Sequence, residues 1–193
     1  MYTIRRYKPS DKEKLRYICK ETAWESYKND PVKLETVPII YNDYFTENEP
    51  ENIFVAANEN DEAVGYVICS TDYELFKAKM RTDIKKRVSE TRKFELWQIY
   101  FFLFVMRSLP SEYTTHLHID ILPEYQHMGV GTNLIKALSA HLSEKGEKYM
   151  SVCSVSKTSD GYKFYNKFGF KKIKSHGFGA VSMTYKTIKE NEQ

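Results

Sequence analysis

The chain has 193 residues, of which 41% are hydrophobic and 28% are charged, a composition typical of a single globular domain spanning 1–193. Its 29 basic and 26 acidic residues leave a net charge of only +3, which does not indicate nucleic acid as a partner. Cys19, Cys69 and Cys153 form no CxxC pair, which is typical of reduced thiols in a cytoplasmic protein.

The first part of the chain predicts a strand, two helices and a hairpin. Leu15, Ile18 and Cys19 recur at helical spacing on one face of the first helix. Two short apolar runs flank the turn-forming sequence NENDE, which is typical of an antiparallel hairpin. The expected elements are a strand at 2–7, helices at 8–27 and 37–45, and the hairpin at 53–71.

A long helical segment is expected next, from Tyr73 to about Arg107, at first charged and then aromatic. Its continuous apolar run extends only from Ile99 to Met106, whereas a membrane span needs about 20 residues. We therefore expect no membrane span. The aromatic part, Phe94 to Met106, can belong to the core, to a homodimer interface or to a lid over a substrate. Because large apolar patches usually seek a partner, the first two are favoured.

The last part of the chain alternates strands and helices. In the clearest helix, Leu134, Leu138 and Leu142 recur every four residues, and Gly146 is well placed to end it. The expected elements are a strand at 114–122, a helix at 131–146, a strand at 148–155, a helix at 159–169 and two strands within 170–186. This order predicts an α/β (α+β) fold, in which helices cover a mixed sheet.

The sequence QHMGVGTNL, at 126–134, joins a predicted strand to the clearest helix. Glycines let the backbone approach a ligand, and the first amides of a helix attract anions. A Walker A loop is excluded because no Lys-Ser/Thr pair follows Gly131. A dinucleotide fingerprint is weak, since Leu134 stands where a third glycine is needed. A phosphate-binding turn and a simple tight turn both remain open.

Three segments together resemble the GNAT superfamily of acyl-CoA N-acyltransferases. Gln126, Gly129 and Gly131 match the family's Gln/Arg-x-x-Gly-x-Gly/Ala motif for acetyl-CoA. The opening IRRYKPSDKEKL is similar to the family's first strand and helix. The sequence GYKFYNKFGFKKI resembles its LYEKLGF element, with these residues in register: Phe164, Tyr165, Lys167, Gly169 and Phe170.

The chain departs from the family pattern in two places. Thr158 stands where many members have an asparagine seven residues before the tyrosine. A helical insert at about 73–112 replaces the usual short turn between the third and fourth strands. With this insert, HLHIDILPEYQ resembles the acetyltransferase-like domain of O-GlcNAc hydrolase proteins. That second resemblance implies an alternative function, a catalytically weak or inactive module that binds acyl-CoA or another protein.

The GNAT resemblance implies a mostly antiparallel sheet flanked by helices, with the insert between the third and fourth strands. It also implies acetyl transfer from acetyl-CoA to a primary amine of a small molecule or peptide, by direct attack in a ternary complex. Backbone amides after the strand would hold the pyrophosphate, and the strand edge would hold the pantetheine arm. The implied cofactor-binding residues are Ile119, Ile121, Gln126, His127, Met128, Gly129, Val130, Gly131, Thr132, Thr158 and Tyr165.

The same resemblance makes Tyr165 the candidate acid for the departing thiolate and places Trp24 and Tyr27 near the acceptor groove. His116, His118 and Asp120 alternate along one strand and so share a face. Asp120 is the candidate catalytic base, with His118 as an alternative base or a substrate-binding group, and a water relay as a rival. A His-His-Asp metal site is the weaker interpretation, and no metal is expected.

Overall fold

The structure is a computed structural model that describes residues 1–188; residues 189–193 of the predicted domain lie outside it. Within the described residues, seven strands form one sheet in the order β1-β2-β3-β4-β5-β7-β6, and only β4 and β5 are parallel. This confirms the expected mixed, mostly antiparallel sheet. The strands are β1 (Thr3–Arg6), β2 (Ile53–Ala57), β3 (Ala63–Ser70), β4 (His116–Ile121), β5 (Tyr149–Ser156), β6 (Lys171–Ser175) and β7 (Ala180–Lys186).

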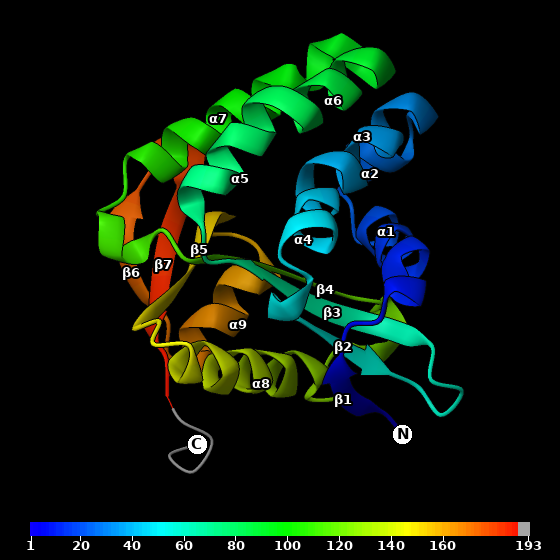
Figure 1. Ribbon diagram of the computed structural model, residues 1–193, viewed down its shortest axis with the longest axis vertical. Helices are drawn as coiled ribbons and strands as arrows, with labels where there is room; N and C mark the ends of the chain where they lie inside the picture. Colours follow the sequence, from blue (N-terminus) through cyan, green and yellow to red (C-terminus); the bar gives the residue numbers. More distant parts are fainter. Residues whose placement is uncertain (189–193) are drawn as a thin grey trace.

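Helices from the first part of the chain pack on one face of the sheet (Figure 1). They are α1 (Lys12–Glu21), α2 (Glu25–Lys28), α3 (Pro31–Tyr41) and α4 (Asp43–Asn48). The single helix predicted over 8–27 is wrong, because α1 ends just before Thr22. The Thr22 hydroxyl donates to the carbonyls of Ile18 and Cys19 in the last turn of α1. Helix α3 begins earlier than predicted, since Asp30 accepts from the Lys33 N–H at 3.0 Å and Pro31 follows as first helical residue.

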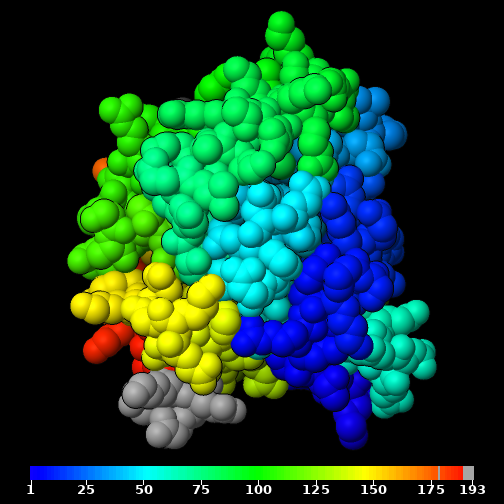
Figure 2. Space-filling view, in the orientation of Figure 1, coloured from blue at the N-terminus to red at the C-terminus, as the bar shows by residue number. Residues whose placement is uncertain are grey.

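The expected helical insert follows β3 and lies at the top of the molecule in Figures 1 and 2. It consists of α5 (Tyr73–Lys79), a π-helical segment (Met80–Ile84), α6 (Lys85–Arg92) and α7 (Leu96–Arg107). No helix within residues 1–188 has the length and apolar character that crossing a bilayer requires.

Helix α7 is apolar on nearly all sides. The sequence pattern therefore could not show whether this helix belongs to the core, to a dimer interface or to a lid. One side lies in the core through Ile99, Leu103 and Met106. The other side remains on the surface and forms an aromatic stripe together with Phe94 in the turn just before the helix. The stripe consists of Phe94, Trp97, Tyr100, Phe101 and Phe104. The insert is therefore partly core and partly an exposed aromatic surface.

The opposite face of the sheet is covered by α8 (Val130–Glu144), with α9 (Asp160–Phe168) beside its first turn. The predicted leucine stripe is confirmed, since Leu134, Leu138 and Leu142 are all fully buried. Strands β4 and β5 pair only at His116 and Ser151 and then separate. This separation opens the middle of the sheet and positions the site described next.

Candidate active site

A cleft of about 980 Å³ lies beside β4, and residues of β4, the glycine turn, α8 and α9 line most of it. Its walls come from both faces of the sheet, from Thr22 at the end of α1 to Gly131 at the start of α8. Tyr165 of α9 and Asp120 of β4 both line it. No described residue of α5, α6 or α7 lines this cleft, so the insert does not form a lid over it.

The glycine turn forms one wall of the cleft and presents free backbone amides. His127 and Gly129 have positive φ angles of 61° and 80°, and Gly129 directly precedes α8. The amides of His127, Met128 and Gly129 have no acceptor among the described residues, and the first amides of α8 have none within the helix. Six consecutive N–H groups, from His127 to Thr132, can therefore approach one anion at the positive end of the helix.

At Gly131, the second glycine of the turn, there is no room for a larger side chain. A Cβ on Gly131 would lie 3.2 Å from Phe164 Cζ and 3.3 Å from Ile121 Cδ1, closer than normal packing allows. Gln126 lies on the cleft, but its side chain donates to the Ile121 carbonyl at 2.9 Å and so holds the turn against the end of β4. The turn and the strand end thus form one rigid unit.

The edge of β4 that faces the cleft has free backbone groups. Leu122 donates to the Val64 carbonyl at 3.0 Å, so the even-numbered residues of β4 direct their N–H and C=O groups to β3. Ile119 and Ile121 direct theirs to β5, which has moved away. Apart from the Ile121 carbonyl, which accepts from Gln126, these groups can bind an extended ligand as a missing strand would.

Asp120, which lines the cleft, is the centre of a hydrogen-bond network with side chains of β3 and β4. Tyr66 donates to its Oδ2 at 2.5 Å, and His118 Nε2 lies 3.0 Å from the same oxygen. Burial acts to raise the pKa of Asp120, but the charge and hydrogen bonds of His118 and Tyr66 outweigh it, so the pKa lies below its usual value. Asp120 is therefore a carboxylate that is already engaged.

His118 is the more basic member of this pair. Burial acts to lower its pKa, but the Asp120 charge and hydrogen bond raise it above the usual value. Its ring stacks on Tyr41 at a centroid distance of 5.7 Å, and Tyr41 donates to Gln98 of α7 at 3.0 Å. The side chain of His118 is 38% exposed, and its Nδ1 has no hydrogen-bond partner in the described chain.

The His-His-Asp arrangement considered from the sequence does not form. His116 is buried among aromatic rings, 4.5 Å from Phe76 and 5.6 Å from Phe102 by ring centroids. Desolvation lowers its pKa to about 4, so its ring is neutral at physiological pH. It contributes to packing and not to the cleft.

A different set of possible metal ligands does come together. Single ligand atoms of Cys19, His118 and Asp120 lie within 4.8 Å of one another. However, Asp120 already accepts from Tyr66, and burial, with the negative charge of Asp120, raises the pKa of Cys19 well above its usual value. A neutral thiol is a poor metal ligand, so these groups fit a hydrogen-bond network better than a metal site.

Tyr165 lies in the cleft wall on α9, between Phe164 and Phe170. Burial, and then the negative charge of Asp120, raises its pKa. Its hydroxyl has no hydrogen-bond partner among residues 1–188. The two predicted catalytic residues therefore share one cleft, where the phenol is held in its protonated form.

Several predicted binding residues, His118 among them, do not line this cleft. Trp24 is 71% exposed on the surface, while Tyr27 is buried beneath the Lys33 ammonium, 4.0 Å from its ring centroid. Met128 is half exposed, and its carbonyl accepts from the Tyr2 hydroxyl. Thr158 is 3.0 Å from Ser156 by their hydroxyl oxygens, so its side chain serves the turn before α9. Predicted side-chain contacts of these residues with substrate or cofactor gain no support, whereas the Met128 N–H remains one of the free amides of the turn.

Sequence reasoning missed the residues that hold the His118–Asp120 pair, namely Tyr66 and Tyr41. Tyr66 is opposite Asp120 in the register of β3 and β4. The alternation of residues in the hairpin places Tyr66 on one face of β3. Because the long insert separates β3 from β4 in the sequence, the sequence does not show which strand pairs with β3 next to Tyr66. Tyr41 belongs to a helix whose start was missed, and its contact with His118 depends on tertiary packing.

Comparison with known proteins decides the family. The model of the Acetyltransferase (GNAT) family matches residues 16–170. The chain belongs to the GNAT acetyltransferase family. Comparison with curated proteins gives no match.

Solved structures share the GNAT fold over nearly the whole chain. A protein named SsHAT is 26% identical, with a TM-score of 0.82 over 97% of this chain and 99% of that chain. PaiA N-acetyltransferase from Thermoplasma acidophilum, in complex with coenzyme A, is 16% identical, with a TM-score of 0.63 over 96% and 99%. Polyamine N-acetyltransferase from Drosophila melanogaster is 15% identical, with a TM-score of 0.57 over 96% and 100%.

GNAT membership identifies acetyl-CoA as the acetyl donor of this protein. The residues of the cleft fit it, because the free amides of the turn suit a pyrophosphate and the open edge of β4 suits the pantetheine arm. The finer resemblance to the acetyltransferase-like domain of O-GlcNAc hydrolase proteins stays a prediction.

Proposed function

We propose that this GNAT protein transfers the acetyl group to a primary amine of a small molecule or peptide, by direct attack in a ternary complex. The observation that carries this proposal is the cleft through the sheet, which joins the anion-binding turn to Asp120 and Tyr165. Two structural neighbours are named as N-acetyltransferases of amines, one of polyamines and one of agmatine. Their names support an amine as the acceptor.

The donor half of the proposal rests on backbone groups. The amides from His127 to Thr132 bind the pyrophosphate, and the free edge of β4 at Ile119 binds the pantetheine arm. Gln126 already donates to the Ile121 carbonyl, so the N–H of Ile121 is the backbone group left at this residue. This N–H stabilises the negative charge that develops on the thioester oxygen.

The acceptor half requires a base. We favour His118 over the predicted Asp120 for this role, with Asp120 as the member of the pair that lines the cleft itself. An amine must lose a proton before or during attack, and an engaged carboxylate with a lowered pKa is a weak proton acceptor. His118 has a raised pKa and a free Nδ1, while Asp120 orients its ring through Nε2. We assign His118 as the base and Asp120 as its positioning residue.

Tyr165 acts on the leaving thiolate, and its raised pKa defines how. The phenol stays protonated, but complete proton transfer to a thiolate with a pKa of about 8.5 is uphill. A hydrogen bond from Tyr165 to the sulfur still stabilises the charge that develops there. Tyr165 is thus a stabilising donor, and the thiolate takes its proton from solvent.

Calorimetry with acetyl-CoA, followed by an amine panel that measures free thiol release, tests the proposal. We expect acetyl-CoA binding and thiol release that depends on the added amine. Binding without release for any amine would favour the alternative function, a catalytically weak or inactive acyl-CoA-binding module. Absence of binding at millimolar acetyl-CoA would refute both.

The aromatic stripe on α7 is proposed to pack against a second copy of the chain. Phe94, Trp97, Phe101 and Phe104 follow the alternating three- and four-residue spacing of helix–helix seams. Together with Tyr100 they are between 38% and 78% exposed, which leaves roughly 550 Å² of aromatic surface at about 200 Å² per side chain. With its polar rim, this approaches the ~800 Å² per partner of a specific interface.

Two further expectations remain proposals. Residues 1–193 are taken as one GNAT-like domain, because α7 of the insert packs on β5 of the central sheet. A cytoplasmic location is proposed because Cys19, Cys69 and Cys153 are all free thiols, as a reducing compartment maintains them.

A further inference from the structure

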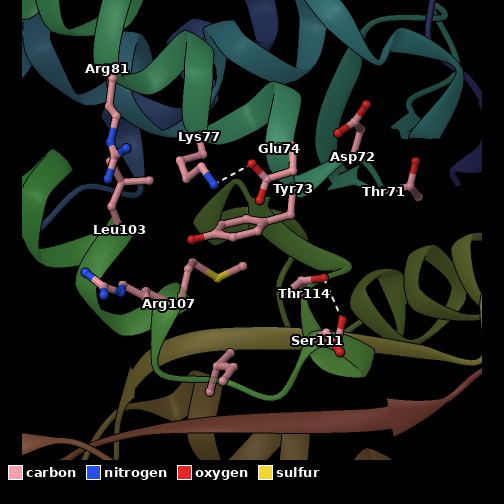
Figure 3. A pocket seen from close by; sticks show the side chains of 12 residues that line it. Thr71, Asp72, Tyr73, Glu74, Lys77, Arg81, Leu103, Arg107, Ser111 and Thr114 are labelled. Carbon is pink, nitrogen blue, oxygen red and sulfur yellow. Dashed lines mark hydrogen bonds and ion pairs between the residues drawn. The ribbon is translucent and has the colours of Figure 1, made fainter.

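A second pocket, of about 840 Å³, lies within the helical insert (Figure 3). It is bounded by the end of β3, by α5 and α7, and by the turn before β4. It shares no lining residue with the cofactor cleft. Thr114 of this pocket and Ile121 of the cleft are at opposite ends of β4, roughly 20 Å apart at about 3.3 Å per residue.

Basic side chains from two helices line one end of the pocket. Tyr73, Lys77 and Arg81 follow one another at four-residue spacing, so they project from the same side of one continuous helical segment. Arg81 lies in the π-helical segment, a type of distortion that is frequent at functional sites. Arg107 comes from the last turn of α7. Both guanidinium groups are on the hydroxyl side of the Tyr73 ring in Figure 3.

The charges of this pocket are only partly neutralised by the protein. Lys77 pairs with Glu74, and Asp72 accepts from the Leu75 N–H at 2.9 Å as the cap of α5. Both acidic side chains are therefore already engaged. Arg81 and Arg107 make no hydrogen bond or ion pair with any described residue, although both are close enough to Tyr73 to affect its titration.

Other groups in the pocket suit an anion with an organic body. Burial raises the pKa of Tyr73, so its hydroxyl keeps its proton and can donate beside the two guanidinium groups. Leu103, Met106 and Leu109 supply apolar surface next to these donors. Planar guanidinium groups match the oxygen pairs of phosphates and carboxylates.

We infer that this pocket is a second ligand site, where Arg81, Arg107 and the Tyr73 hydroxyl bind the phosphate or carboxylate group of a small organic anion. Its apolar part rests on Leu103 and Met106 of α7. The site belongs to the insert and is independent of the acetyl-transfer reaction. The Phe76, Phe102 and His116 rings pack together beside β4, and no residue lines both sites.

The test follows the side-chain Nε–Hε signals of the arginines by NMR during titration at constant ionic strength. Inorganic phosphate is one probe, citrate is the other, and sodium chloride is the control. We expect the Arg81 and Arg107 signals to move and saturate with phosphate, with citrate or with both, and not with chloride. Saturation by phosphate alone identifies a phosphate ester as ligand class, and saturation by citrate alone identifies a carboxylate.

Variants separate this pocket from general anion binding, with the affinity of each measured by calorimetry. R81Q/R107Q removes two exposed side chains without a structural partner, so the protein should fold, and affinity for the effective probe should fall about tenfold or more. Lys172→Gln, on the exposed edge strand β6, is the matched control and should leave the affinity unchanged. The inference is overturned if neither probe moves the two signals, if chloride moves them equally, or if R81Q/R107Q binds as tightly as the parent.

Discussion

Replacing Tyr165 with phenylalanine removes one oxygen from the wall of the cleft and leaves the ring in place. The ring keeps its contacts with Phe164 and Phe170, whose centroids lie 5.4 and 5.1 Å away. The hydroxyl has no hydrogen-bond partner among the described residues, so its loss leaves no buried group unsatisfied. We therefore expect Tyr165→Phe to fold with nearly unchanged stability and acetyl-CoA affinity.

The loss of rate follows from the role assigned to the hydroxyl. A hydrogen bond to a charged group contributes about 1.5–3 kcal/mol, and each 1.4 kcal/mol is about tenfold in rate. If Tyr165 stabilises the departing thiolate, kcat should fall roughly 10- to 100-fold. A larger loss is not expected, because a thiolate with a pKa of about 8.5 can leave without an acid.

The assay is free thiol release with a saturating amine, with the acetyl-CoA Kd measured separately by calorimetry. Tyr162→Phe is the matched control, because Tyr162 is on the same helix and does not line the cleft. An unchanged kcat in Tyr165→Phe would refute the stabilising role. An equal loss in Tyr162→Phe would show that α9 as a whole, and not this hydroxyl, sets the rate.

Three further changes test the rest of the site and the surface. Asp120→Asn removes the charge that raises the pKa of His118, while burial continues to lower that pKa. The acidic limb of the rate–pH profile should therefore move to lower pH, and kcat should fall about tenfold or more. An acidic limb that does not move would contradict His118 as the base. Gly131→Ala places a Cβ 3.2 Å from Phe164 Cζ, and over-packing of about 1–3 kcal/mol should raise the acetyl-CoA Kd roughly tenfold by calorimetry. Phe101→Asp with Phe104→Asp should halve the mass measured by light scattering; a parent that is already monomeric, or that binds lipid vesicles through this stripe, would contradict the dimer.

The identity and order of the elements were largely predictable, because local rules encode them. The hairpin around NENDE, the leucine stripe of α8 and the glycine turn all appear where the sequence placed them. The end of α1 before Thr22 and the early start of α3 were missed, although Asp30 followed by Pro31 is a helix-start signal that the sequence does contain. Element boundaries depend on such small local differences in free energy.

The acceptor side was less predictable, because contacts between distant segments form it. Tyr66 and Asp120 are 54 positions apart, and Tyr41 meets His118 only after α3 packs on the sheet. The sequence selected Trp24 and Tyr27 for this role by their position in the first helix, and the structure places neither in the cleft.

By itself, the sequence determined the glycine turn, because Gly129 must adopt a positive φ, a requirement that acts within one short segment, whereas the need for Gly131 comes from the approach of α9 in the tertiary structure. It likewise determined that a strand would precede the turn and a helix would follow it. Only the tertiary structure decided that β4 and β5 separate after one residue pair, which turns the strand edge into a binding site. It also decided that Asp120 accepts a hydrogen bond from Tyr66, the contact on which the proposed role of His118 rests, since the register of strands across a long insert is fixed by packing of the whole domain.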